Sequence, residues 1–194
     1  MADPRHPART RHLTLARLPI ALLCLVGLGL VPLAGCDEQQ KAPPGFVKVD
    51  LGGQTYTLQL ALDDDTRTKG LGGRESLPEK GGMLFVFPRA RRLEFIMRDC
   101  FMDIDIIFLD PNGRILKMHH MPMEPPRGEN EGEAGDWDPM KAANRRYEAR
   151  LKHYPSAGPA EFAIEIAGGE LEKLKLHVGE QVQLDTAGLK AQAH

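Results

Sequence analysis

Cysteine is scarce in this chain, which has three among its 194 residues: Cys24, Cys36 and Cys100. The amino-terminal pattern described below would remove Cys24 and modify Cys36, so only Cys100 would keep a free thiol. A single cysteine cannot form an internal disulfide. The folded domain must therefore be stabilised by a packed core rather than by covalent links.

Long apolar runs are also missing. The uninterrupted apolar stretch from Ile20 to Val31 has twelve residues, whereas a helix needs about 20 to cross a hydrocarbon core of about 30 Å. Pro19 and Pro32 flank this stretch, and two glycines weaken it further as a stable helix. It fits the apolar region of a secretion signal better. A transmembrane anchor followed by a chance cysteine is the alternative interpretation.

Motifs that name a reaction are absent: there is no Walker phosphate loop, no GxSxG and no HExxH. Positive charge is not in excess either. Without residues 1–35, 21 Lys and Arg stand against 26 Asp and Glu, a net charge of about −5. This balance argues against nucleic acid or an anionic bilayer as the main partner. We expect no nucleic-acid partner and no cofactor.

The amino terminus has the pattern of a lipoprotein processing site. Leu33-Ala34-Gly35-Cys36 follows the apolar stretch, and small residues before a cysteine suit the signal peptidase. The basic residues ahead of the stretch are Arg5, Arg9, Arg11 and Arg17. We predict that residues 1–35 are a signal peptide and that lipid on Cys36 anchors the protein to a membrane, facing the periplasm. Asp37 slightly favours the inner membrane, and residues 36–45 are expected to be a tether.

The remaining sequence predicts one domain over residues 46–185 and a flexible tail over residues 186–194. Short apolar segments are separated by Gly-rich turns, as at Gly52-Gly53 and Asp110 to Gly113. The expected strands are residues 46–51, 55–60, 83–87, 93–97, 104–109, 114–121, 162–166 and 181–184. This pattern predicts a mostly β, α+β fold: a compact antiparallel sheet or a partly closed small barrel, with two or three short helices and one inserted helix.

The inserted helix lies within residues 124–154, which begin with a polar, Pro- and Gly-rich stretch. Asp138-Pro139 predicts the helix start. Its expected apolar face consists of Met140, Ala143, Tyr147 and Leu151. The opposite, basic face would hold Arg145, Arg146, Arg150 and Lys152. We expect a partner-facing module rather than core, with the basic face near anionic lipid headgroups. A solvated helix is the alternative.

Several short segments follow one another in a recognisable order: residues 67–71, Arg74, Leu77-Pro78 and residues 82–87, 95–98, 104–110, 159–169 and 178–180. Together they resemble the domain-of-unknown-function 192 family. Their order and spacing match over nearly all of residues 58–184. The resemblance implies a small, mostly β domain, often secreted or lipid-anchored, without an established activity. The chain departs from the family pattern at Ile96, Arg98 and the longer segment 124–154.

The polar residues that match the family pattern are Arg67, Arg74, Arg98 and Asp105, and Met97 is grouped with them as a candidate ligand-binding residue. On a continued helix, Arg67 and Arg74 would share one face, and a guanidinium pair can bind a carboxylate, phosphate or sugar ring. Asp105 lies in an apolar strand and needs a partner if buried. The residues would form either an anion or sugar site or a structural Arg–Asp pair.

A cluster of soft metal ligands is peculiar to this chain: Met118, His119, His120, Met121 and Met123. Thioether and imidazole groups suit copper. On a strand, however, alternate residues face opposite sides, so one site would receive only half of the cluster unless the strand ends there. A surface strand end with two solvated histidines is the alternative.

Two weaker signals are a thiol and an acidic run. Cys100 could act as a nucleophile with His119 or His153 as base, or it could be a buried, inert thiol. Asp63-Asp64-Asp65 lacks the spacing of a calcium loop. A helix cap is the better interpretation of this run.

These observations favour a non-enzymatic, lipid-anchored periplasmic domain that binds a small polar or anionic ligand or an envelope protein. The first alternative is an enzyme acting on envelope polysaccharide, with Asp105 as acid or base and Arg67, Arg74 or Arg98 stabilising charge. A second carboxylate would come from Glu94, Asp99 or Asp103. The second alternative is periplasmic copper binding through the Met/His cluster.

Overall fold

The computed structural model describes residues 42–136, 138 and 140–194. The predicted signal peptide, Cys36, Asp37 and most of the tether lie outside the described residues. Among those residues, no helix has both the length and the apolar character needed to cross a membrane.

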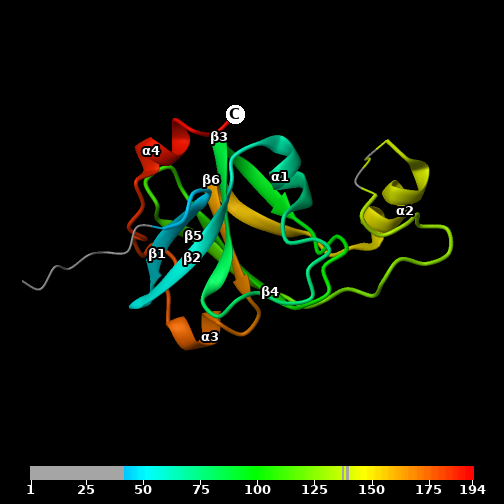
Figure 1. The fold of residues 1–194 in the computed structure, drawn as a ribbon, viewed down its shortest axis with the longest axis horizontal. Coiled ribbons are helices and arrows are strands. Elements are labelled where there is room, and N and C mark those ends of the chain that lie inside the picture. Colours follow the sequence, from blue (N-terminus) through cyan, green and yellow to red (C-terminus); the bar gives the residue numbers. More distant parts are fainter. Residues whose placement is uncertain (1–41, 137, 139) are drawn as a thin grey trace, which may run out of the picture. The chain divides into compact units, whose positions relative to one another are not determined.

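Six strands pair into one mixed sheet (Figure 1). They are β1 (Phe46–Leu51), β2 (Gln54–Ala61), β3 (Gly81–Phe95), β4 (Ile104–Leu109), β5 (Ile115–Met121) and β6 (Tyr154–Ala167). Their order in the sheet is β1-β2-β3-β6-β4-β5. The mostly β, α+β class predicted from the sequence is confirmed, although the sheet is open and not wholly antiparallel.

The parallel pair is β2 and β3, while every other neighbouring pair is antiparallel. Parallel strands need a crossover connection that returns the chain to the same end of the sheet. Helix α1 (Asp64–Lys69) and the loop after it form this crossover. Asp63 caps α1, because its Oδ1 accepts a hydrogen bond of 2.8 Å from the Thr66 N–H. The cap interpretation of the acidic run is therefore confirmed.

Strand β3 is longer than the sequence indicated. The chain was expected to leave the sheet at Pro88, with a separate strand at residues 93–97, but one strand continues to Phe95. Irregularities in its pairing with β6 fall between Val86 and Arg91 and again between Arg92 and Glu94. A bulge accommodates a proline that the regular ladder would exclude.

Two apolar clusters cover the two faces of the sheet. Alternation along β3 sends Leu84 and Val86 to one cluster and Phe85 and Phe87 to the other. The first cluster is closed by carboxy-terminal side chains, which are Leu174, Leu176, Val182 and Leu189. The second is closed by residues from the α1–β3 connection and the β3–β4 connection, which include Leu71, Met97 and Cys100.

The carboxy-terminal residues, for which the sequence predicted a flexible tail, contact the core of the domain in the structure. Helices α3 (Leu171–Leu174) and α4 (Thr186–Lys190) lie in this part of the chain. Leu189 is 5% exposed in the first cluster, and the His194 N–H donates to the Leu62 carbonyl. Ala193 packs against the same cluster, and the His194 carbonyl accepts a hydrogen bond from Arg67. The predicted strand at residues 181–184 is reduced to an isolated bridge between Arg114 and Gln181.

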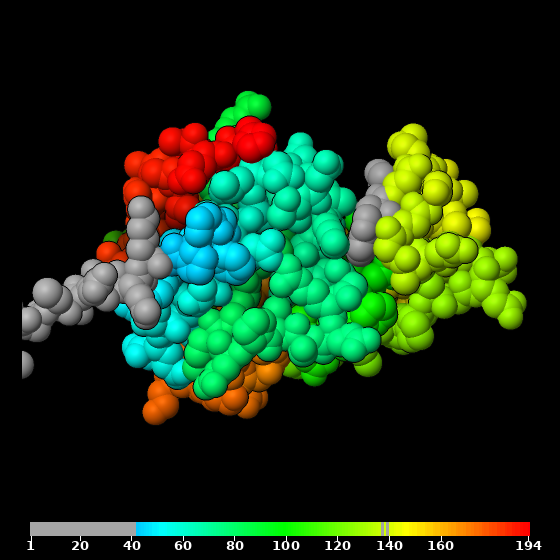
Figure 2. Space-filling model, viewed as in Figure 1, coloured from blue at the N-terminus to red at the C-terminus, as the bar shows by residue number. Residues whose placement is uncertain are grey.

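The inserted segment forms a projecting lobe that contains α2 (Ala142–Arg150) (Figures 1 and 2). The helix begins after Lys141, later than the Asp138-Pro139 pair predicted. Asp138 Oδ1 instead accepts from the Met140 N–H in a turn. Of the predicted apolar face, Tyr147 and Leu151 are buried, but Met140 is 75% exposed.

Candidate functional site

Arg67 is held by four hydrogen bonds to the protein. Its Nη1 donates to the carbonyls of Leu62 and Val86, and its Nη2 donates to Asp64 Oδ1 and to the His194 carbonyl, at 2.6 to 2.8 Å. These bonds join α1 to β3 and to the end of the chain. Arg67 therefore acts mainly as a structural cross-link.

Arg74 does not share a helix face with Arg67, contrary to the expectation from their spacing. Helix α1 ends at Lys69, and Gly70 leaves it with a positive φ of 53°, a conformation that glycine adopts without strain. Arg74 lies in the following loop, where its Nη2 donates to Gln59 Oε1 at 2.6 Å.

Asp105 is buried on the face of the sheet that the first apolar cluster covers, the same face as Ile107. Its partners are not arginines. One carboxylate oxygen lies 2.7 Å from His120 Nδ1, and the other accepts from the Leu171 N–H at 2.8 Å. The sequence could not identify His120 as the partner because their pairing depends on the register of β4 against β5. The enzyme alternative required Asp105 beside Arg67, Arg74 or Arg98, and the structure does not bring them together.

The Met/His cluster is also divided by the sheet. Strand β5 continues through Met121, so Met118 packs against the first apolar cluster and Met121 lies in the second. The imidazole of His119 lies 2.8 Å from the Pro155 carbonyl, whereas His120 is bound to Asp105. Met123 is 53% exposed beyond the strand. The five residues therefore do not converge, and the described residues contain no group of three or more His, Cys, Asp or Glu arranged for a metal.

A cavity of about 410 Å³ opens between α1 and the distal half of β3. Its apolar lining comes from Leu71, Phe85, Phe87, Leu93 and Phe95. Five basic residues also line it: Arg67, Lys69, Arg91, Arg92 and Arg98. Of these, Lys69, Arg91 and Arg92 are exposed, whereas Arg67 and Arg98 are half-buried. The cavity thus combines an apolar interior with a cationic rim.

Glu165 of β6 contributes a carboxyl group to this cavity, and sequence reasoning missed it as a site residue. The residue is 5% exposed, and burial raises its pKa to about 8, with the charge of Arg74 acting in the opposite direction. The carboxyl is therefore mostly uncharged at neutral pH. The available signal was a carboxylate inside the apolar run from Phe162 to Ile166.

Cys100 also lines the cavity, but it is a poor nucleophile. Burial raises the pKa of its thiol to about 12, and the nearby carboxyls of Glu165 and Asp99 act in the same direction. The two proposed bases have other partners, His119 at the Pro155 carbonyl and His153 at Glu94. The inert-thiol interpretation fits this geometry. Met97, another candidate, is 1% exposed and belongs to the second apolar cluster.

Arg98 connects the cavity to the inserted segment. It lines the cavity, and its Nη2 lies 2.8 Å from Glu148 Oε1 on α2. The neighbouring residue, Asp99, is 4% exposed and forms a bidentate ion pair with Arg127, with N–O distances of 2.8 and 2.9 Å. The inserted segment is thus joined to the β3–β4 connection at two successive residues.

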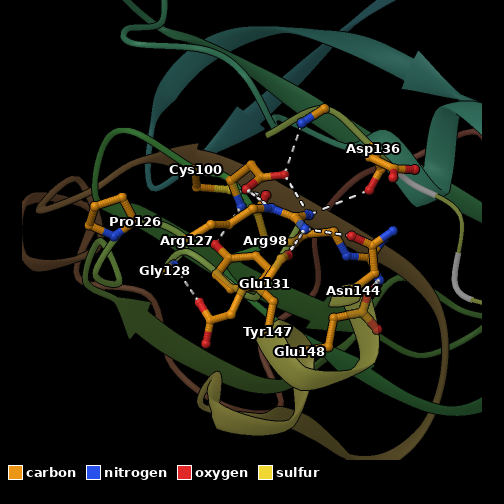
Figure 3. Close-up of polar contacts among 12 residues, drawn as sticks. Arg98, Cys100, Pro126, Arg127, Gly128, Glu131, Asp136, Asn144, Tyr147 and Glu148 are labelled. Carbon is orange, nitrogen blue, oxygen red and sulfur yellow. Dashed lines mark hydrogen bonds and ion pairs between the residues drawn. The ribbon is translucent and has the colours of Figure 1, made fainter. Parts of the chain in front are cut away.

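Arg127 is the centre of the inserted segment (Figure 3). Besides Asp99, it donates to Asn144 Oδ1 and to the Glu131 carbonyl, and its guanidinium lies 4.3 Å from the centre of the Tyr147 ring. Two of the basic residues that were expected to face outward instead bind groups within the inserted segment. Arg146 donates to the Asn130 carbonyl, and Arg150 pairs with Glu131 at 2.8 Å.

Comparison with known families shows to which family the chain belongs. The family model DUF192, described as "Uncharacterized ACR", matches residues 47–184. The chain belongs to the DUF192 family. The match confirms the resemblance seen in the sequence and covers both the sheet and the inserted segment. A comparison with curated proteins gives no match.

Two solved structures share the DUF192 fold. One, from Sinorhizobium meliloti 1021, is described as a candidate transcription regulator; it is 22% identical, with a TM-score of 0.52 over 71% of this chain and 91% of that one. The other is a protein of unknown function from Novosphingobium aromaticivorans DSM 12444, also 22% identical, with a TM-score of 0.53 over 74% of this chain and 91% of that one. Likeness at this identity shows the fold alone.

Proposed function

We propose that this DUF192 protein is a lipid-anchored domain of the cell envelope that binds a small anionic ligand in the cavity between α1 and β3. The cationic rim of that cavity carries the proposal. Lys69, Arg91 and Arg92 place three positive charges around one opening, in a chain whose net charge is −2. A focused positive field of this kind attracts and orients anions.

The protonation state of Glu165, which lines the cavity, supports the same ligand. A charged carboxylate at Glu165 would repel an anion, but the burial that raises its pKa to about 8 keeps the group mostly neutral at pH 7. A neutral carboxyl can donate a hydrogen bond to an acceptor on the ligand. The polysaccharide-enzyme alternative gains no comparable support, because Asp105 lies on the opposite sheet face.

Binding can be tested with three anions: acetate, inorganic phosphate and glucuronate. We expect at least one to raise the melting temperature of the full chain in nanodiscs, since a ligand that binds only the folded state stabilises it. Arg91→Gln should reduce this shift. Lys117→Gln is the matched control, because Lys117 is exposed on β5 and does not line the cavity. Equal losses in the two variants would refute the assignment of the cavity.

The membrane anchor requires its own test. Cells producing the full chain should incorporate radioactive palmitate into it, and globomycin should cause the unprocessed form to accumulate. Cys36→Ala should abolish labelling, whereas Cys24→Ala, which keeps the processing site, should leave it unchanged. A mature form that is soluble and unlabelled would overturn this part of the proposal.

A further inference from the structure

The lining of the cavity between α1 and β3 is divided by chemistry. The interior is formed by aliphatic and aromatic side chains, and the Phe85 and Phe95 rings meet edge to face with their centres 5.0 Å apart. The rim is formed by charged residues. Leu71 and Phe85 are almost fully buried, but Phe95 and Ile96 are only half-buried. A ligand that carries only charge would leave this half-buried apolar surface in contact with water, which costs free energy.

Two acidic side chains also lie on the rim. Asp64 pairs with Arg67 at 2.7 Å, and Glu94 lies 2.9 Å from His153 Nδ1. The three cations Lys69, Arg91 and Arg92 thus outnumber Glu94, the acidic residue of the rim whose partner is not permanently charged, so the rim keeps a net positive charge. Arg91 also lies over the Phe87 ring, 5.2 Å from its centre, which places a cation directly beside the apolar interior.

Arg98 holds an anionic group of the protein itself. The carboxylate of Glu148 is 2.8 Å from its guanidinium, and the side chains are 16% and 23% exposed. Glu148 comes from α2, within the segment that is longer than usual for the family. A carboxylate bound at the edge of a cavity competes with any anionic ligand that approaches the same guanidinium.

From this geometry we infer that the ligand is an amphipathic anion, with an apolar or aromatic body on the half-buried Phe95 and Ile96 side chains and an anionic head group that competes with Glu148 for Arg98. The inference rests on the proposed function and specifies its ligand class. Apolar burial supplies affinity, and the guanidinium fixes the orientation of the head group. Glu148 is a specificity-determining residue, because an anion must displace its carboxylate from Arg98 in order to bind. Weak or purely polar anions are therefore disfavoured.

Three fluorinated probes separate the two parts of such a ligand. Trifluoroacetate has the head group without the body, para-trifluoromethyl-phenylacetamide has the body without the charge, and para-trifluoromethyl-phenylacetate has both. We would measure their binding to the full chain in phosphatidylcholine nanodiscs by fluorine NMR, with empty nanodiscs as the correction for partition. The phenylacetate should bind at least about tenfold more tightly than either partial probe, which corresponds to about 1.4 kcal/mol.

Variants then test the role of the ion pair. Arg98→Gln should weaken phenylacetate binding, whereas Glu148→Gln should strengthen it about threefold, a size expected for a partly exposed ion pair. The gain from Glu148→Gln should disappear when Arg98→Gln is also present. Glu129→Gln is the matched control, since it removes one negative charge from an exposed residue of the same inserted segment. Glu129→Gln should leave binding unchanged.

The outcomes distinguish this inference from the proposed function. If trifluoroacetate binds as tightly as the phenylacetate, or if the neutral amide does, the amphipathic ligand class is wrong. If Glu148→Gln and Glu129→Gln have equal effects, the competition at Arg98 is refuted. In each case, anion binding that Arg91→Gln weakens would still support the proposed function. Failure of every anion to bind the wild-type chain would remove both.

Discussion

In the six-stranded sheet the central buried side chains are aliphatic and aromatic, whereas in the inserted segment (residues 124–152) the central side chain is the guanidinium of Arg127. The sheet gains its stability from apolar area removed from water on both faces. The segment gains it from charge-assisted hydrogen bonds around Arg127 and from the ring of Tyr147. The difference teaches that the sheet tolerates changes which conserve apolar volume, while the inserted segment depends on one fully satisfied polar centre.

The largest effect is expected from a cavity in the sheet. Phe162→Ala removes a fully buried ring from β6, and such a substitution costs about 3–5 kcal/mol. Because β6 lies between β3 and β4, the whole domain should lose stability. Urea unfolding followed by circular dichroism measures this. A loss below about 1 kcal/mol would show that the first apolar cluster is not the main source of stability.

Arg127→Met should unfold the inserted segment and leave the sheet folded. The substitution leaves Asp99 buried without its ion-pair partner, and breaking a buried pair costs about 3–5 kcal/mol. Hydrogen exchange followed by NMR should show lost protection within residues 124–152 alone. Arg145→Met is the control, because Arg145 is exposed on the same helix. Equal loss of protection in the sheet would contradict the separation of the two regions.

The two regions should also respond to pH with opposite sign. Below about pH 4.5, Glu165 is protonated in both the folded and the unfolded chain. Between about pH 4.5 and 8, only the folded chain keeps the proton. The free energy of unfolding therefore falls as the pH rises through this range. Glu165→Gln should remove this slope and be the more stable protein near pH 8. Thermal unfolding at several pH values measures the difference, and identical slopes would contradict the assigned pKa.

In the inserted segment the responsible group is Glu131. Its hydrogen bond from Arg150 lowers its pKa from 4.5 to about 2. Its contribution is present above about pH 4.5 and is lost as the pH falls toward 2. Amide signals of residues 124–152 should therefore lose their native positions in acid, and Glu131→Gln should make this loss less dependent on pH.

The smallest effect is expected at Met140. This residue belongs to the apolar face predicted from helical spacing, but its side chain is 75% exposed. Met140→Ser should therefore change stability by no more than about 0.5 kcal/mol. Leu151→Ala, at the buried end of the same predicted face, should cost about 2 kcal/mol or more. Urea unfolding of both variants tests the contrast. Similar costs would show that Met140 belongs to the buried apolar face, as the helical spacing predicted.

Much of the fold could be predicted because it depends on local patterns. The alternation in Tyr56, Leu58 and Leu60 and the Gly52-Gly53 turn correctly predicted the first hairpin. Pro88 misled the assignment of β3, since a bulge cannot be recognised from the residues around a proline alone. The candidate site was predicted only in part: Arg67 and Arg98 do line the cavity, but Glu165 was not recognised and Asp105 lies elsewhere.

The sequence by itself determined the mostly β class, the positions of β1, β2, β4 and β5 and the cap at Asp63, because each depends on residues a few positions apart. It also determined the family, through the order of short segments along the chain. Tertiary structure alone decided that Asp105 pairs with His120, that Glu148 reaches Arg98 and that Glu165 lies in an apolar cavity. These partners are brought together by strand register and by the docking of the inserted segment. Register and docking are set by the packing of the whole core, so no local pattern contains them.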